Sequence, residues 1–563
     1  MLDNLKSSRI IDILISLLII VVVAVMRLPF VSKFLYEWDS ASYALALQNY
    51  SIAHQQPHPP GYILYVALGR GVNYFFHDAN TSLVFISVVM SILTVILVYF
   101  MTKKIFSQRA AIASVVFLIF NPLFWFYGEI ATIYIFEAFF AVLIAYLAYN
   151  ALKENRYFLY LSALVLGLAG GFRLDLTEFL LPLWLFCAWG YGKTSYLKIG
   201  KSFIVLIAAV LVWLIPTIIS TGGLGNYLHL LSTIGLSTAN SSILQGASLS
   251  SQIINSGLAV IWSLWGLTIY GLVLLVIFLI YHRQNWKSKF IPYLKNPKSI
   301  FFLLWIGPAF LFFFVIYIIK PGYTLIYLPA LMIILGYVAH RLSNDLHASF
   351  PKISARSFLV SILLIGVILN SVIFLYPYNL HQGELWETPQ DNLTGSQKVL
   401  FEINAGFLFN NQKIMANDQN TKLHIDTITN LSQSDPNSTI IAIRDITRED
   451  EGFDWRKAMY YLPDYNVYYL FDHENSGITG NVSVWHGKNH TDDLSKSPQI
   501  EIPLNQSVRR IVWIMSDQSN FYNEVQSKAG LQTINLPNGL KIYYTDVGSG
   551  PVDLEVSGFI FKR

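Results

Sequence analysis

The chain has 563 residues and a mass of 63.9 kDa; 54% of the residues are hydrophobic and only 13% are charged. Soluble proteins carry about 25% charged residues, so much of this chain is expected to face lipid. The single cysteine, Cys187, excludes a disulfide-stapled module and a thiolate zinc cluster. The formal net charge of +4 requires no nucleic-acid partner, because basic residues that anchor membrane loops produce it equally well.

Long apolar runs recur from Ile11 to about Tyr376. A helix needs about 20 apolar residues to cross a bilayer, and on this measure we expect about eleven transmembrane helices. Their approximate limits are 11–29, 81–101, 110–127, 132–151, 157–172, 179–191, 202–220, 257–281, 300–319, 324–340 and 357–377. The sequence therefore predicts a polytopic α-helical membrane domain over residues 1–377, whose first helix is retained as an anchor.

The distribution of basic residues predicts the orientation of these helices. With a cytoplasmic N-terminus, eighteen Lys and Arg residues fall on the inner side and five fall in outer loops. The five outer bases are Arg27, Lys33, Arg70, Arg173 and Lys320. Because inner loops of membrane proteins are enriched in Lys and Arg, and because the helix count is odd, residues after Tyr376 are expected outside the cytoplasm.

Residues 378–563 differ in composition from the membrane part and contain no apolar run long enough to span a bilayer. Alternating apolar patterns predict strands at 439–444, 466–471, 508–514 and 540–545 and helices at 455–461 and 521–527. Such alternation is typical of an α/β unit. We therefore expect a C-terminal extracytoplasmic α/β domain over residues 378–563.

The first outer loop, residues 31–80, is too long to be a simple linker. The spacing of its apolar residues favours two amphipathic helices lying on the membrane surface, and Pro59-Pro60-Gly61 forces a turn between them. Asp39 follows the first membrane helix closely and is a candidate catalytic base, although an Asp before a helix also commonly serves as an N-cap. His58 sits in the turn as a second candidate, although a lone His in a Pro-rich turn more often has a structural role.

Further acids lie in or near the next outer loops. Glu129 occupies the second outer turn, and Glu137 follows two helical turns later, where one of the two acids could serve only as a partner of a helix N-terminus. Arg173 lies close to Asp175 and Glu178, and a simple ion pair with either acid is the structural alternative to a functional role.

The ninth and tenth predicted helices are joined by Lys320-Pro321-Gly322-Tyr323, which places one cation at the tip of a turn. The structural alternative for Lys320 is that its side chain reaches toward the interface. Together, acids and cations on one side of a membrane suit transfer of a sugar from a lipid phosphate. A carboxylate accepts the proton of the attacking hydroxyl, and cations stabilise the charge that grows on the leaving phosphate.

An acid after the first helix, a long first loop and a second acid in the next outer loop resemble the GT-C superfamily of membrane glycosyltransferases. More specifically, Trp38-Asp39-Ser40 followed by His58-Pro59-Pro60-Gly61-Tyr62 resembles the branch that is similar to protein O-mannosyltransferases. The resemblance covers roughly residues 10–340. It implies a GT-C-like fold, a polyprenyl-phosphate-linked sugar as donor, no nucleotide sugar at the active site, and inversion at the anomeric carbon.

By the same resemblance, Asp39 is the expected base and Glu129 the second catalytic acid. Lys320 and Arg173 are the expected contacts of the donor phosphate. The residues expected to contribute to substrate binding are Glu37, His58, Tyr62, Asp175 and Tyr323. No cofactor is required by these residues; a divalent cation is a candidate, but the sequence assigns it no ligands.

The expected partners are the polyprenyl-phosphate sugar, a protein or glycan acceptor with a free hydroxyl, and membrane lipid, without nucleic acid. The expected location is a plasma membrane or its equivalent. A transporter or lipid flippase is the alternative function, although repeated halves with broken helices, which would mark it, are not visible in the sequence. A non-catalytic scaffold is a third alternative, and it predicts that Asp39 is dispensable.

Overall fold

The fold is known from a computed structural model of the whole chain. It describes all residues except 1, 154–156, 191–193, 238–243, 245, 247, 284–295, 318, 377–408, 434, 445–452, 473–480 and 518. The predicted domain boundary at 377 and 378 lies outside the described residues. So do the predicted inner-loop bases Arg156, Lys193, Lys287, Lys289 and Lys295.

The chain divides into two compact units. The membrane unit consists mainly of Met1–Val31 and Pro59–Leu380, and the tail unit mainly of Ser32–His58 and Ile414–Arg563. Residues 32–58 thus pack with the tail, whereas the sequence-based division grouped them with the membrane helices. The physical reason is that apolar side chains of this segment, such as that of Leu45, enter the hydrophobic core of the tail unit.

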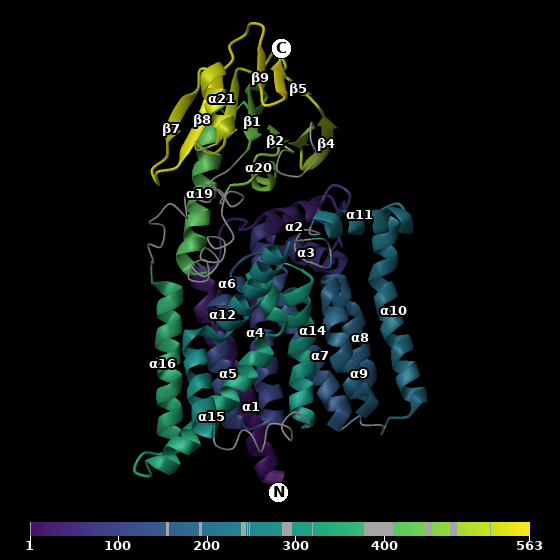
Figure 1. Ribbon diagram of the computed structural model, residues 1–563, viewed down its shortest axis with the longest axis vertical. Coiled ribbons are helices and arrows are strands. Elements are labelled where there is room, and N and C mark those ends of the chain that lie inside the picture. The colour runs from purple at the N-terminus through teal and green to yellow at the C-terminus, as the bar shows by residue number, and fades with distance from the viewer. Residues whose placement is uncertain are drawn as a thin grey trace. The chain divides into compact units, whose positions relative to one another are not determined.

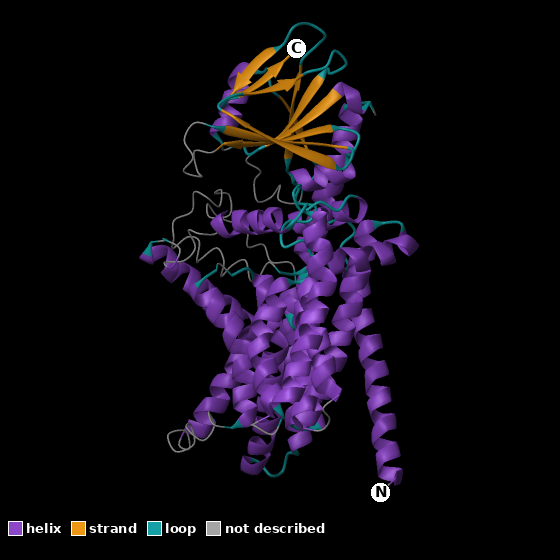
Figure 2. Ribbon diagram, turned by 90° about the vertical axis from the view of Figure 1, so that its right-hand side faces the viewer, coloured by secondary structure: helices purple, strands orange, loops and turns teal. Residues whose placement is uncertain are grey.

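The membrane unit is helical (Figures 1 and 2). Its helices are α1 (Leu2–Arg27), α3 (Ile63–Phe76), α4 (Ala79–Ile105), α5 (Gln108–Ile119), α6 (Pro122–Tyr127), α7 (Tyr134–Lys153), α8 (Tyr157–Phe172), α9 (Leu174–Trp189), α10 (Tyr196–Ser220), α11 (Leu224–Ser237), α12 (Leu249–His282), α14 (Pro297–Val315), α15 (Leu328–Ser349) and α16 (Ala355–Leu375), with 3-10 turns η1 (Leu28–Phe30) and η6 (Pro321–Ile326). Helix α4 packs against α5 and α7, and α15 packs against α5.

Each of the eleven predicted apolar segments coincides with helical structure. Among the described residues, seven helices are long and apolar enough to cross a membrane, and α5 and α8 are shorter apolar helices. The predicted segment 110–127 divides into α5 and α6, because Asn121 caps a new helix that has Pro122 in its first turn. Eleven crossings remain a prediction.

Glycines of α8 allow α10 to approach it closely. A Cβ atom on Gly167 would lie 2.6 Å from the Cβ of Ala209 and 2.6 Å from the carbonyl oxygen of Leu206. The Gly167 carbonyl accepts a hydrogen bond of 2.8 Å from the Trp213 indole. Small residues at such a contact are typical of helix packing in membranes.

The first outer loop contains the two helices that the sequence predicts, α2 (Trp38–Gln48) and α3, with the predicted turn between them. The expected surface position of α2 is wrong. Eight consecutive residues of α2, from Ser40 to Leu47, are buried, so this helix has no exposed apolar face to lay on a membrane. In contrast, α3 ends in the exposed aromatic residues Tyr74 and Phe75.

The tail unit is an α/β domain, as predicted. Its seven-stranded sheet has the order β4-β3-β2-β1-β6-β8-β7, with β1 parallel to β2 and to β6 and the outer pairs antiparallel. The strands are β1 (Thr439–Ile443), β2 (Asn466–Asp472), β3 (Val482–Lys488), β4 (Thr491–Ser497), β6 (Arg510–Ile514), β7 (Gln532–Asn535) and β8 (Lys541–Asp546). A second sheet has the order β5 (Ile500–Pro503), β10 (Phe559–Lys562) and β9 (Asp553–Val556).

In the described part of the tail unit, three helices accompany these sheets: α19 (Asn411–Leu431), α20 (Trp455–Tyr461) and α21 (Asn520–Lys528). The four predicted strands and both predicted tail helices are confirmed. The strands β3, β4, β5, β7, β9 and β10 and the helix α19 were not predicted. Several of these strands are short or polar, and the exposed pattern of β4 carries little apolar signal.

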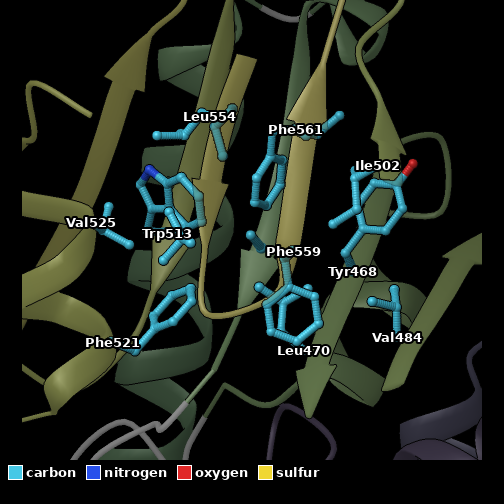
Figure 3. Packing of buried hydrophobic residues seen from close by; sticks show 14 of the residues in the cluster. Tyr468, Leu470, Val484, Ile502, Trp513, Phe521, Val525, Leu554, Phe559 and Phe561 are labelled. Atoms are coloured by element: carbon cyan, nitrogen blue, oxygen red, sulfur yellow. The ribbon is translucent and has the colours of Figure 1, made fainter. Parts of the chain in front are cut away.

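One hydrophobic core lies between the two sheets of the tail unit (Figure 3). Trp513 of the large sheet packs edge-on against Phe561 of the small sheet, with 5.1 Å between the ring centroids. Phe521 of α21 packs against Trp513 at 6.0 Å. This core covers one face of the large sheet, and the opposite face supports α20.

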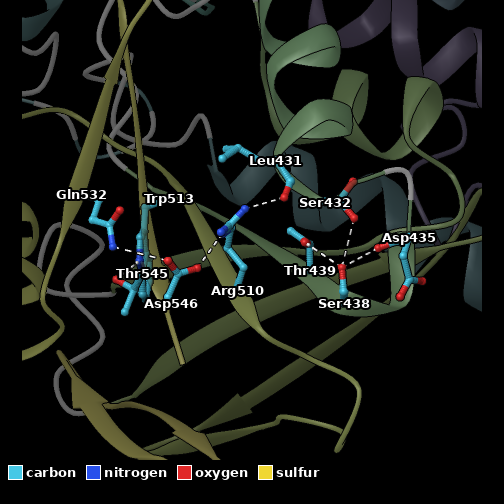
Figure 4. A network of polar contacts seen from close by, with 10 residues as sticks. All are labelled: Leu431, Ser432, Asp435, Ser438, Thr439, Arg510, Trp513, Gln532, Thr545 and Asp546. Atoms are coloured by element: carbon cyan, nitrogen blue, oxygen red, sulfur yellow. Dashed lines mark hydrogen bonds and ion pairs between the residues drawn. The ribbon is translucent and has the colours of Figure 1, made fainter. Parts of the chain in front are cut away.

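Polar contacts hold the end of α19 to the same sheet (Figure 4). Arg510 donates a hydrogen bond of 2.8 Å to Asp546 across β6 and β8, and it also donates to the carbonyl oxygen of Leu431. Ser438 donates to the carbonyl oxygens of Asp435 and Ser432 at 2.7 and 3.3 Å. Helix α19 is therefore fixed to the sheet before the chain enters β1.

Candidate active site

Asp39 does not cap α2. The N-cap residue is Glu37, which forms a capping box with Ser40, and the Glu37 amide donates to the Ser40 hydroxyl at 3.2 Å. The interpretation of Asp39 as an N-cap is therefore wrong, since Asp39 lies within the first helical turn. Glu37, which was predicted to bind substrate, uses its carboxylate to accept from the backbone of Ser40.

The Asp39 carboxylate is paired with His58. Its Oδ1 atom lies 3.4 Å from Nδ1 of His58, and the two side chains are 26% and 24% exposed. The pair therefore combines a defined partner with access to a ligand. An imidazole in this position can orient the carboxylate and share a proton with it, as a general base requires. The structure thus brings together two of the predicted site residues, Asp39 and His58.

Arg173 lies at the centre of a second cluster, in the membrane unit. It is the N-cap residue of α9, and its Nε atom lies 2.7 Å from Glu137 of α7 and 3.0 Å from Asp175. The predicted ion pair of Arg173 with Asp175 is therefore present, but it is not the whole arrangement. A second carboxylate, that of Glu137, comes from a different helix. Glu178 forms no ion pair with Arg173 among the described residues.

Two tyrosine rings enclose the Arg173 guanidinium. Its carbon atom lies 5.0 Å from the ring centroid of Tyr134 and 4.7 Å from that of Tyr323. Close packing of η6 on α7 makes this possible, since a Cβ atom on Gly322 would lie 2.5 Å from Cγ of Tyr134. Tyr62 also interacts electrostatically with Arg173. The predicted residues Tyr62, Asp175 and Tyr323 therefore gather around the predicted phosphate contact.

The charges of this cluster limit what it can bind. Two carboxylates face one guanidinium, so the cluster alone carries an excess negative charge that opposes a phosphate. However, both carboxylates approach Nε, and the terminal nitrogens of Arg173 have no hydrogen-bond partner among the described residues. Lys320 is exposed at the start of η6, two residues before Gly322. A phosphate there would need both cations.

Glu129 occupies a different place in the membrane unit. Its side chain is fully buried, and its Oε1 atom accepts a hydrogen bond of 2.5 Å from the Trp125 indole. Burial raises the pKa of Glu129, and the nearby charge of Arg27 opposes this rise. Arg27 is itself fully buried and donates to the carbonyl oxygen of Ile119 at 2.8 Å. This environment is typical of an acid that stabilises a helix junction, and the catalytic role of Glu129 remains a prediction.

The sequence did not indicate that Glu137 and Tyr134 belong with Arg173. The available signal for Glu137 was its position as a lone acid in an apolar helix, since such acids usually have a partner. For the candidate cation, the described residues contain no group of three or more His, Cys, Asp or Glu side chains placed to hold a metal ion.

Comparison with known families and folds indicates the class of the chain. Residues 57–219 match the family model described as dolichyl-phosphate-mannose-protein mannosyltransferase. The fold is similar to that of ArnT from Cupriavidus metallidurans bound to undecaprenyl phosphate, with a TM-score of 0.53 and 12% identity over 97% of this chain and 100% of that chain. These findings indicate a membrane glycosyltransferase, whose residues 57–219 resemble that family and whose fold is similar to that of ArnT.

This glycosyltransferase is a multi-pass integral membrane protein, and the match argues against a transporter or flippase. Apo ArnT gives a TM-score of 0.52 at 12% identity, covering 98% of this chain and 100% of that one. AglB from Archaeoglobus fulgidus, in complex with an inhibitory peptide and a dolichol-phosphate, gives 0.45 at 12% identity, covering 99% of this chain and 76% of that one. Among curated proteins, no sequence matches this glycosyltransferase significantly.

Proposed function

We propose that this glycosyltransferase moves a sugar from a polyprenyl phosphate to a hydroxyl group of a protein or glycan, with inversion, on the extracytoplasmic face. The observation that carries the proposal is the fixed guanidinium of Arg173. Its Nε atom is held by Glu137 and Asp175 at 2.7 and 3.0 Å, which leaves the terminal nitrogens for a ligand.

A lipid-linked donor suits the construction of the protein. The seven long apolar helices found among the described residues are expected to lie in a bilayer, where the polyprenyl chain of the donor also lies. The description of the matched family names dolichyl-phosphate mannose. ArnT, which has a similar fold, was crystallised with undecaprenyl phosphate. These likenesses support a polyprenyl-phosphate sugar as donor and leave the identity of the sugar to experiment.

The donor phosphate is assigned to Arg173 and Lys320. Two N–H donors of one guanidinium can bind two phosphate oxygens in parallel, and Arg173 is held in one orientation by its carboxylate partners. Lys320 adds the second positive charge that offsets Glu137 and Asp175. As the sugar leaves, negative charge grows on the phosphate, and fixed cations stabilise that charge more than they stabilise the bound donor.

Asp39 is assigned as the base. The acceptor oxygen bonds to the anomeric carbon while the bond from that carbon to the phosphate oxygen breaks, and the bonding electron pair leaves with the lipid phosphate. Asp39 takes the proton of the acceptor hydroxyl in the same step, and His58, 3.4 Å away, holds the carboxylate in position. A single displacement of this kind inverts the configuration.

The remaining residues are assigned to the sugar. Asp175, whose side chain is 23% exposed, can accept hydrogen bonds from sugar hydroxyls. Tyr62 and Tyr323 supply phenol groups and ring faces beside it. The Glu37 carboxylate already accepts a hydrogen bond from the backbone of Ser40, so we assign Glu37 the smallest contribution to substrate binding.

The proposal is tested with the purified protein in liposomes and a panel of radiolabelled polyprenyl-phosphate hexoses, with acceptor peptides and glycans. We expect transfer from the lipid-linked sugar and none from nucleotide sugars. In Arg173→Lys and Lys320→Ala the KM for the donor should rise, because each removes part of the phosphate contact. Transfer from a nucleotide sugar without lipid carrier, or an unchanged donor KM in both variants, would contradict the proposal.

A further inference from the structure

The segment that carries Asp39 and His58 is bound to the tail at its beginning. Both carboxylate oxygens of Asp418 on α19 accept backbone hydrogen bonds, from Lys33 at 2.8 Å and from Phe34 at 3.0 Å. Asp418 also accepts from the Ser32 hydroxyl at 3.1 Å. Asp418 thus fixes the chain at a point five residues before Asp39.

The next contacts lie beside Asp39 itself. Lys457 of α20, which is fully buried, donates to the carbonyl oxygen of Tyr36 at 2.6 Å. The side chain of Trp38 packs edge-on against Trp455 of α20, with 5.8 Å between the ring centroids. Trp38 is thus an anchor in the tail, while its neighbour Asp39 pairs with His58.

The end of the segment is bound to the same helix. Arg456 of α20 has no exposed surface and donates to the carbonyl oxygen of His54 at 2.8 Å. It pairs with Asp492 at 3.2 Å. Asp492 accepts from the Gln56 side-chain amide at 3.1 Å and lies 3.3 Å from Nδ1 of His54. These contacts fix the chain two and four residues before His58.

Arg456 therefore contacts both arms of the segment. Its guanidinium carbon lies 5.7 Å from the ring of Trp38, beside Asp39, while its terminal nitrogen binds the arm that leads to His58. The guanidinium also lies 4.3 Å from the ring of Trp455. Only a planar group with several N–H donors can stack on these rings, pair with Asp492 and bind a carbonyl at once, so lysine is a poor substitute.

We infer that Arg456 is a positioning residue for sugar transfer, which sets the distance between Asp39 and His58 by joining the two arms that carry them. This inference rests on the proposed function of Asp39. On this inference the tail contributes to catalysis, because its side chains bind the backbone of the segment that carries the base. Misplacement of a catalytic group by about 1 Å can lower a rate by roughly 10²-fold.

The test compares Arg456→Lys with a matched control, Arg444→Lys. Arg444 is a second buried tail arginine, and its guanidinium lies 4.6 Å from the ring of Phe521 and 5.8 Å from that of Phe559. Both variants keep a positive charge and disturb the tail, whereas only Arg456 joins the arms. The milder variant Gln56→Ala, which removes one contact to Asp492, serves if Arg456→Lys does not accumulate.

Each variant is assayed for kcat, for donor KM, and for hydrogen exchange in residues 33–58. We expect Arg456→Lys to lower kcat about 10- to 100-fold with little change in KM and to increase exchange in that segment, and we expect Arg444→Lys to do neither. Combined with Asp39→Asn, Arg456→Lys should cause almost no further loss, because a positioning residue acts through the group it positions.

An unchanged kcat in Arg456→Lys, or a loss that adds fully to that of Asp39→Asn, overturns the inference and leaves the base assignment standing. A fully active Asp39→Asn protein overturns the proposed function itself, whatever Arg456→Lys does. The two failures are therefore distinguishable.

Discussion

Nδ1 of His58 lies 3.4 Å from Oδ1 of Asp39, although nineteen positions separate the two residues in the sequence. Glu37, and not Asp39, caps the helix on which Asp39 lies. The cap of this helix therefore does not depend on the Asp39 carboxylate. This separation of roles allows the base to be tested without loss of the cap.

Asp39→Asn should lower kcat by roughly 10²- to 10⁴-fold, the usual contribution of a positioned general base. The protein should remain folded and inserted, because the capping box of Glu37 and Ser40 is untouched. Single-turnover assays with a polyprenyl-phosphate sugar measure the effect. Asp78→Asn is the matched control, since exposed Asp78 caps α4 by accepting from the Thr81 amide at 2.7 Å and Asn caps equally well. Normal transfer by Asp39→Asn would reject the assignment.

Glu137→Ala should destabilise the protein more than Asp175→Ala does. The Glu137 side chain is 2% exposed and that of Asp175 is 23% exposed, while both pair with Arg173. Breaking a buried pair costs about 3–5 kcal/mol, because the remaining charge is left without its partner. Thermal unfolding in detergent should show the difference as a larger fall in Tm for Glu137→Ala. Equal losses would mean that the two carboxylates are equivalent.

Gly322→Ala should weaken use of the donor. A Cβ atom at this position would lie 2.5 Å from Cγ of Tyr134, so η6 or the tyrosine must move, and the enclosure of Arg173 opens. Overpacking of this kind costs roughly 1–3 kcal/mol, which corresponds to a rise of about 5- to 150-fold in donor KM when the whole cost falls on the donor-bound state. Gly307→Ala is the control, because the nearest atom to its Cβ, in Leu303, is 3.9 Å away. A donor KM equal in the two variants would count against the role of the turn.

The stability of the protein should fall as the pH is lowered from about 6.5 to 4, with His424 as one cause. Burial lowers the pKa of this histidine from 6.5 to about 4, and its ring stacks on Phe453 at 4.9 Å. In that range the unfolded chain binds a proton that the folded chain does not, so the free energy of unfolding falls with falling pH. Below pH 4 the total loss of unfolding free energy caused by His424 approaches roughly 3 kcal/mol.

The measurement is the pH dependence of thermal unfolding in wild type and in His424→Gln. Lys457 lies near the ring and its charge lowers the pKa of His424 further. Burial raises the pKa of Asp454 and Asp492, so these acids act in the opposite direction. The difference between the two proteins isolates His424, and identical pH dependence would show that it is protonated in the folded state as well.

The predicted orientation can be tested with introduced cysteines. Cys187 is the only cysteine and is buried, so Cys187→Ala provides a clean background. An impermeant thiol reagent added to intact cells should label Asp553→Cys in the exposed surface of the tail and should not label Lys352→Cys between α15 and α16 before lysis. The reverse labelling would place the tail in the cytoplasm and remove the basis for extracytoplasmic transfer.

The sequence by itself determined the features that depend on local pattern. Apolar runs predicted the helices, because the cost of burying backbone polar groups in lipid imposes helices of a minimum length. Alternating apolar residues predicted β1, β2, β6 and β8, which form the well-buried centre of the tail sheet. The short motif around Asp39 and His58 indicated the family, since its residues are near one another in the chain.

Only the tertiary structure decided which distant residues meet. The pairing of Glu137 with Arg173 joins two helices, and the contact of Arg456 with His54 spans 402 positions. No local pattern encodes such contacts, because they depend on how helices and sheets pack after they have formed. The surface position predicted for α2 was wrong for the same reason. The apolar pattern of α2 is that of a membrane-surface helix, but in the tail unit α2 packs against α20, and Leu45 enters the core that α20 forms with the sheet.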